Sequence, residues 1–70
     1  MDKTLAIFGE RLKEARKARG WTQDKLAQET GLLNSAISHF ETGRREPNLK
    51  NLVLLIRTLE CEASWILGVK

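Results

Sequence analysis

Four short polar side chains recur at the spacing that places them on one face of a helix: Asn34, Ser35, Ser38 and His39. The opposite face of that helix carries the apolar pair Ile37 and Phe40. Amides, hydroxyls and an imidazole on an exposed helix can donate to or accept from base edges in the major groove of DNA. Leu33, at the entrance of the helix, could meet a thymine methyl group.

The residues needed for catalysis or metal binding are scarce. The chain has one cysteine, Cys61, and one histidine, so an intrachain disulfide and a histidine-based metal cluster are excluded. The spacing of zinc ligands is absent, and no general base stands at a fixed spacing from a nucleophile. We therefore expect no enzymatic activity, no metal and no cofactor.

The length of 70 residues predicts one small domain over 1–70. Such a chain buries only roughly 60% of the surface that its unfolded form exposes, which favours binding at a surface over a deep catalytic cleft. The balance of 12 basic and 9 acidic residues permits a polyanionic partner without requiring one. The apolar stretch Leu52 to Ile56 is too short to span a membrane, and the start of the chain has no apolar signal core. We expect a cytoplasmic protein.

Helical periodicity extends along the chain, and no segment alternates apolar and polar residues as a half-buried strand would. The first helix is predicted to run to about Arg19, capped by Thr4 and ended by Gly20. Arg16 lies beside its inward stripe. That stripe is Leu5, Phe8, Leu12 and Ala15.

A helix-turn-helix unit is predicted over residues 23–41. Thr22 caps its first helix, Gln23 to Thr30, and Gly31 supplies the turn. Its second helix runs from about Asn34 to Glu41.

Two more helices follow the polar loop 42–48. Asn48 is predicted to cap a helix over 49–59, and a short helix covers roughly 63–67 before Gly68. The expected core positions of the longer helix are Leu49, Leu52, Val53, Ile56 and Leu59. The fold class is all-α.

Three segments of the chain resemble the lambda-repressor-like helix-turn-helix proteins, the family of phage repressors, Cro proteins and xenobiotic-response-element-type regulators. The segments are FGERLKEARKARGWTQDKLAQETG, ISHFETGRREPNL and LLIRTLECEASWILG, from about Phe8 to Gly68. The specific signal combines Trp-Thr-Gln, Ile-Ser three residues before Glu, and Glu-x-Gly-x-x-x-Pro. The resemblance implies a compact five-helix domain that binds operator DNA as a dimer.

The resemblance also implies roles for individual residues. The four polar residues of the helix 34–41 would read bases, and Arg16 and Glu41 match a salt bridge between the first and third helices. Contacts to the DNA backbone would come from Thr22, Gln23, Thr42, Arg44, Arg45, Asn48 and Lys50. Arg44 and Arg45 could instead form a solvated loop, but their position directly after the helix 34–41 favours phosphate contact.

The sequence departs from the family pattern at three positions. Leu33 stands where a Ser or Thr usually caps the recognition helix, so either the cap is lost or Asn34 becomes the cap and leaves base readout. Leu54 stands where the family usually has a polar residue, and Glu60 where glycine commonly ends the fourth helix.

The C-terminal part has more apolar residues than one short helix needs for its own packing. We expect a homodimer interface formed by Leu54, Trp65, Ile66 and Val69. The resulting hypothesis is a sequence-specific transcription regulator of phage or bacterial repressor type, with the helix 34–41 in the major groove of an operator. The alternative is a protein-interaction module of the same fold, such as an antitoxin-like or coactivator fragment. The sequence does not distinguish a complete Cro-like protein from the DNA-binding half of a longer repressor.

Overall fold

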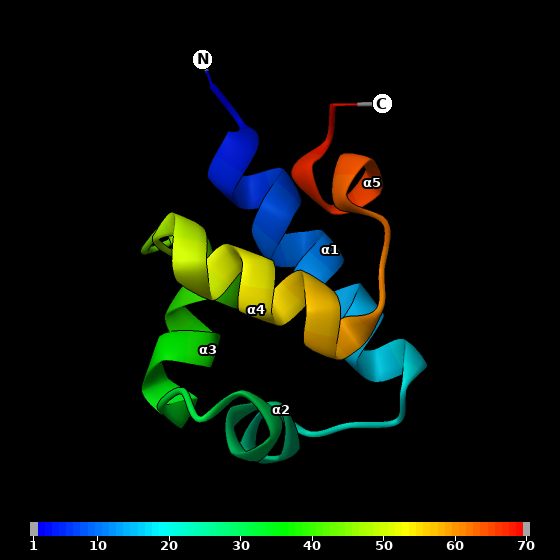
Figure 1. The fold of residues 1–70 in the computed structure, drawn as a ribbon. Coiled ribbons are helices and arrows are strands. Elements are labelled where there is room, and N and C mark those ends of the chain that lie inside the picture. The colour runs from blue at the N-terminus through cyan, green and yellow to red at the C-terminus, as the bar shows by residue number, and fades with distance from the viewer. Residues whose placement is uncertain (1, 70) are drawn as a thin grey trace.

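Helix α1 (Thr4–Ala18) lies at the centre of the arrangement and contacts both α3 (Asn34–Glu41) and α5 (Ala63–Leu67). The computed structural model describes residues 2–69. In Figure 1, α2 (Gln23–Thr30) and α3 lie at one end, α4 (Leu49–Leu59) crosses in front of α1, and α5 lies beside the first turns of α1. Over residues 2–69 this is an all-α, five-helix structure without strands, as predicted. None of these helices combines the length and apolar character that crossing a membrane requires.

Predicted capping residues set both ends of α2 and the start of α4. The Thr22 hydroxyl accepts the N–H of Lys25 at 3.1 Å, and Asn48 Oδ1 accepts the N–H of Asn51 at 2.8 Å. Gly31 ends α2 in the left-handed conformation, with φ of 75°. Because these local signals are strong, the sequence placed α2, α3, α4 and α5 correctly.

The predicted cap of α1 is wrong. Thr4 is the first residue inside the helix, and the residue before it, Lys3, makes no side-chain capping bond. Asp2 Oδ1 instead accepts the N–H of Thr4 at 2.8 Å and also the Thr4 hydroxyl. A carboxylate two residues upstream reaches this N–H and leaves Thr4 free to enter the helix.

Each helix supplies one of the largest fully buried side chains. These are Leu12, Leu26, Ile37, Leu55 and Ile66. Because five helices converge on one small core, none of them is stable by its own propensity, and each depends on the others for apolar burial.

The predicted core of α4 is wrong at two positions. Leu49 and Val53 are 75% and 38% exposed, whereas Leu55, which was not predicted as core, is fully buried. The inward stripe is Leu52, Leu55, Ile56 and Leu59. The run from Leu52 to Ile56 is apolar at every position, so several helical phases fit it equally well and the period alone does not select one.

A glycine sets the spacing between α1 and α3. A Cβ atom on Gly9 would lie 2.6 Å from the carbonyl oxygens of Phe40 and Glu41. Only a residue without a side chain allows the two backbones to approach so closely. The end of α3 is therefore held directly against α1.

Candidate nucleic-acid interface

The turn between α2 and α3 is closed by short hydrogen bonds. The N–H of Gly31 donates to the carbonyl of Ala27 at 2.8 Å, and the Thr30 hydroxyl accepts the N–H of Leu32 at 3.3 Å. Leu26 and Ile37 are fully buried beneath the turn. The two helices therefore form one rigid unit, and α3 presents its other face outward.

The polar face of α3 lies opposite its buried apolar face. Ile37 and Phe40 are buried, Asn34 and Ser35 are exposed, and Ser38 and His39 are half-buried. Leu33 is also largely exposed, at the N-terminal end of the helix. The structure thus gathers all five residues expected to read bases along one side and one end of α3. Hydroxyl, amide and imidazole groups so placed can form hydrogen bonds with a large polar partner.

The sequence left two possibilities for the start of α3: a lost cap, or Asn34 as the cap. The structure shows the lost cap. Leu33 occupies the capping position with an extended backbone, ψ of 145°, and forms no side-chain capping bond. Asn34 is the first helical residue, and its amide Nδ2 donates to Asp24 Oδ1 of α2. The possibility that Asn34 becomes the cap is therefore wrong. Its carbonyl oxygen and second amide hydrogen remain available outside this contact.

Arg16 and Glu41 form a bidentate ion pair between α1 and α3. Arg16 Nε lies 2.6 Å from Glu41 Oε2, and Arg16 Nη2 donates to Glu41 Oε1 at 3.0 Å. Arg16 Nη1 donates to the carbonyl of Trp21 at 2.7 Å. The side chains are only 8% and 2% exposed. In this geometry the two charges satisfy each other at a site that water hardly reaches.

Gln23 belongs to this buried network, which sequence reasoning missed. Its amide Nε2 donates to Glu41 Oε1 at 3.0 Å, so the first residue of α2 is tied to the last residue of α3. One amide hydrogen of Gln23 and the free N–H groups at the start of α2 remain for an anionic partner. The sequence does contain an amide at the start of the helix-turn-helix unit and a carboxylate at its end. It does not show that these two side chains are close, because only the geometry of the turn brings them together.

The loop after α3 carries the two predicted arginines on the surface. The side chains of Arg44 and Arg45 are exposed. Their backbone N–H groups donate to the backbone carbonyl of His39 at 3.0 and 3.4 Å. The Thr42 hydroxyl donates back to the carbonyl of Ser38 at 3.0 Å, which occupies its only hydrogen. Thr42 can therefore serve an anionic partner through that hydroxyl only if this bond breaks.

Three further residues were expected to contact the DNA backbone: Thr22, Asn48 and Lys50. Two of them cap helices, and the third is exposed on the surface. The side chains of Thr22 and Asn48 accept the capping bonds of α2 and α4. Each keeps a donor that its cap does not use, a hydroxyl hydrogen in Thr22 and an amide group in Asn48. Lys50 is exposed in the first turn of α4, with its ammonium group on the surface.

The predicted interface at the C-terminal end is wrong for Ile66, which is fully buried. The five-residue α5 places Ile66 at its inward position, and the core needs that side chain. Trp65 is half-buried, with the Arg11 guanidinium 5.6 Å from the centroid of its ring and donating to its carbonyl. Leu54 is half-buried and Val69 is largely exposed.

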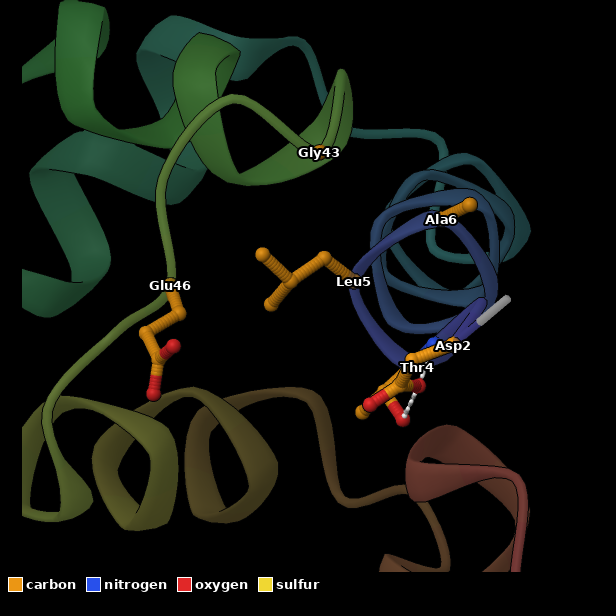
Figure 2. A pocket seen from close by; sticks show the side chains of 6 residues that line it. All are labelled: Asp2, Thr4, Leu5, Ala6, Gly43 and Glu46. Atoms are coloured by element: carbon orange, nitrogen blue, oxygen red, sulfur yellow. Dashed lines mark hydrogen bonds between the residues drawn. The ribbon is translucent and has the colours of Figure 1, made fainter.

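A hollow of about 620 Å³ lies between the start of α1 and the loop before α4 (Figure 2). Leu5 projects into it from α1, and Glu46 faces it from the loop. The Thr4 hydroxyl and N–H both donate to Asp2, which lowers the pKa of that carboxyl group below its ordinary value. This hydrogen bonding forms the start of α1. Two carboxylates at the hollow make it unfavourable for a polyanion.

Cys61 is not activated as a nucleophile. Burial raises the pKa of its thiol above the ordinary value, against a smaller lowering from its own backbone hydrogen bond and from Arg19. The thiol is half-buried after α4. A protonated thiol in this position is a packing residue.

Comparison with known proteins places this geometry among helix-turn-helix proteins. A family model described as helix-turn-helix matches residues 12–66. The HTH-type transcriptional regulator DicA of Escherichia coli K12 is 40% identical over 65 residues, which are 93% of this chain and 47% of DicA. This chain spans about half the length of DicA and of other curated relatives that it matches.

Two solved structures superpose on nearly the whole chain. The P22 c2 repressor in complex with a synthetic operator is 35% identical, with a TM-score of 0.83 over 90% of this chain and 96% of that one. The restriction-modification controller protein C.Esp1396I, solved as a tetramer with its natural 35-base-pair operator, is 26% identical. Its TM-score is 0.82 over 99% of this chain and 91% of that one.

Proposed function

Because this chain belongs to the helix-turn-helix family, we propose that it is a sequence-specific double-stranded DNA-binding regulator of transcription, of the phage or bacterial repressor type. One observation carries the proposal. The exposed polar face of α3 is flanked by the exposed Arg44 and Arg45, while a buried ion pair fixes α3 to α1. The chain acts by binding, in the bacterial cytoplasm, and no catalytic step, metal or cofactor takes part.

In this proposal α3 enters the major groove. Asn34, Ser35, Ser38 and His39 contact base edges, and Leu33 contacts a thymine methyl group. The positively charged loop after α3 contacts phosphates through Arg44 and Arg45, with further backbone contacts from the start of α2 and from Lys50. Gln23 binds a phosphate through the amide hydrogen that Glu41 does not use.

Two copies are proposed to bind together. A dimer would set two α3 helices into successive major grooves roughly 34–36 Å apart and exclude polymerase by occupancy. With Ile66 in the core, the proposed interface consists of the exposed Val69 and the half-buried Leu54 and Trp65. Sedimentation of the protein on a palindromic duplex tests this, with Val69→Asp expected to weaken cooperative binding. Unchanged cooperativity in Val69→Asp would exclude this interface.

The first test of the proposed function is binding to a random duplex at low salt, followed by a salt titration. Neutralisation of phosphates predicts a steep loss of affinity as salt rises. The control is a variant with Arg44→Ala and Arg45→Ala, in which the slope should fall by about one unit per lost contact. No measurable binding at low salt would contradict the proposal and favour a protein-interaction module.

The second test separates base readout from backbone contact. Binding-site selection on Ser35→Ala should relax preference at one operator position, at a cost of roughly 1–3 kcal/mol. Arg45→Ala should weaken binding to all sequences alike. The reverse result, with preference kept in Ser35→Ala and lost in Arg45→Ala, would transfer base readout to the loop.

A further inference from the structure

One nitrogen of His39 is buried without a partner. Nδ1 has no hydrogen bond within the described part of the chain, although the side chain as a whole is only half-buried. The ring therefore turns its Nδ1 edge inward and reaches the exposed face of α3 with its other edge. Buried polar atoms in native proteins are almost always paired, and an unpaired one requires an explanation.

The unpaired atom fixes which nitrogen carries the hydrogen. A neutral imidazole has one N–H, on Nδ1 or on Nε2. A hydrogen on Nδ1 would bury a donor with no acceptor, which is rarer in native proteins than an unused lone pair. A hydrogen on Nε2 places the donor at the outer edge of the ring, where water or another molecule can accept it. The environment of His39 therefore favours the Nε2–H form.

We propose that His39 recognises a guanine in the major groove through this single Nε2–H donor. Guanine presents two neighbouring acceptors, N7 and O6, and the donor of the G·C pair, the cytosine amino group, lies beyond them. In an A·T pair the adenine N7 and the thymine O4 both lie next to the adenine amino group, which is itself a donor. A lone donor thus fits the guanine edge best. The assignment rests on the proposed function and adds the base and the direction of the hydrogen bond.

The main chain at His39 supports this role. Its backbone carbonyl accepts hydrogen bonds from the backbone N–H groups of both Arg44 and Arg45. The residue that would read the base is therefore fixed to the loop that would bind phosphate. These bonds fix the main chain of His39, and the burial of the Nδ1 edge limits how the ring can turn, so its donor has a defined direction.

One test needs no DNA. The chain has a single histidine, so the imidazole ¹⁵N signals need no assignment between residues. The spectrum is recorded at pH 8. We expect Nδ1 without a hydrogen and Nε2 with one. A hydrogen on Nδ1 would overturn the proposal even if the protein binds DNA.

The other test is binding-site selection with the whole chain. The parent should prefer guanine at one position of each half-site, and His39→Ala should reduce that preference about tenfold. His39→Lys, which has donors only, should keep guanine, whereas His39→Gln adds an acceptor and should shift the preference towards adenine. Lys17→Ala, at an exposed position of α1 outside the proposed interface, is the control and should leave this preference unchanged. Thermal unfolding of each variant identifies any change caused by misfolding.

The outcomes separate the two proposals. A guanine preference that survives in His39→Ala, or the absence of guanine at any position sensitive to His39, overturns the assignment and leaves the proposed function intact. A parent protein that enriches no sequence overturns the proposed function, and the assignment with it.

Discussion

Two arginines at the C-terminal end of α1, Arg16 within the helix and Arg19 at its C-cap, join it to its neighbours in different ways. Arg16 is buried at the junction with α3, where every contact is short and bidentate pairing with Glu41 is complete. Arg19, at the junction with α4, is about one-third exposed. Its Nε donates to the carbonyl of Leu59 at 3.1 Å, and its Nη2 lies 3.5 Å from a carboxylate oxygen of Glu60.

The difference follows from access to water. A buried guanidinium must find all its partners within the protein, because an unpaired charge in the interior is strongly destabilising. An exposed guanidinium exchanges each protein contact for a contact with water at little cost. The junction that holds the proposed recognition helix is therefore specific and intolerant of change, whereas the contact of Arg19 with the end of α4 is adaptable.

Glu41→Ala should have the largest effect. It leaves Arg16 buried without its counter-charge, and we expect a loss of about 3–5 kcal/mol in the free energy of unfolding. Urea denaturation followed by helical circular dichroism measures it. Glu46→Ala, which removes an exposed carboxylate five residues away, is the control and should change stability little. A melting temperature within a degree or two of the parent would mean that the pair contributes nothing.

Replacing both partners, as in Arg16→Met with Glu41→Leu, should cost much less than Glu41→Ala alone. The double replacement removes the buried charges together and fills their space with apolar atoms. The same denaturation experiment applies. If the double variant is as unstable as the single one, the junction depends on shape and hydrogen bonding, and the contrast with Arg19 would need another cause.

Among the single variants, Gly9→Ala should have the next largest effect on the free energy of unfolding. In an ordinary helix this change stabilises by up to about 1 kcal/mol, because alanine is the better helix former. Here the new Cβ would meet two carbonyl oxygens of α3, so we expect a loss of about 1–3 kcal/mol instead. Urea denaturation measures the sign of the change in the free energy of unfolding. A more stable variant would show that α1 and α3 can move apart at little cost.

Arg19→Ala should cost at most about 1 kcal/mol. The guanidinium also lies 5.1 Å from the centroid of the Trp21 ring, so part of the loss is packing rather than charge. Lys17→Ala, at an exposed position in the last turn of α1, is the control. Thermal unfolding of both variants gives the difference, and a loss comparable to that of Glu41→Ala would remove the distinction between the two junctions.

Glu60→Gly should be slightly stabilising. Glu60 ends α4 with φ of 52°, a conformation that costs a residue with a side chain about 1 kcal/mol and costs glycine almost nothing. The gain should exceed the loss of the exposed ion pair with Arg19. A destabilised variant would show that this ion pair contributes more than its exposure indicates.

The comparison also explains what could be predicted from the sequence. Caps and glycines act within a few residues, so Thr22, Gly31 and Asn48 marked their helix ends reliably. The phase of α4 was missed because its apolar run contains no polar residue to orient it. The contacts of Gln23 with Glu41 and of Asn34 with Asp24 were missed as well, because they join residues that only the folded turn brings together.

Ile66 shows the limit of counting apolar residues. An excess of apolar side chains near the C-terminal end predicted a surface for a second copy, yet the core uses the most central of them. In a chain of this size most large apolar side chains are needed for the protein's own core. An apolar side chain can be proposed as an interface residue only after its exposure is known.

The close approach at Gly9 has a consequence for laboratory evolution. Asn34 and Ser35 are exposed on the side of α3 away from its buried face, so a library that randomises these two positions leaves the contact with α1 untouched. A new binding preference could then be selected from the same scaffold without compensating mutations elsewhere. Gly9 and the ion pair would stay constant through such a selection, because the register of α3 against α1 depends on them.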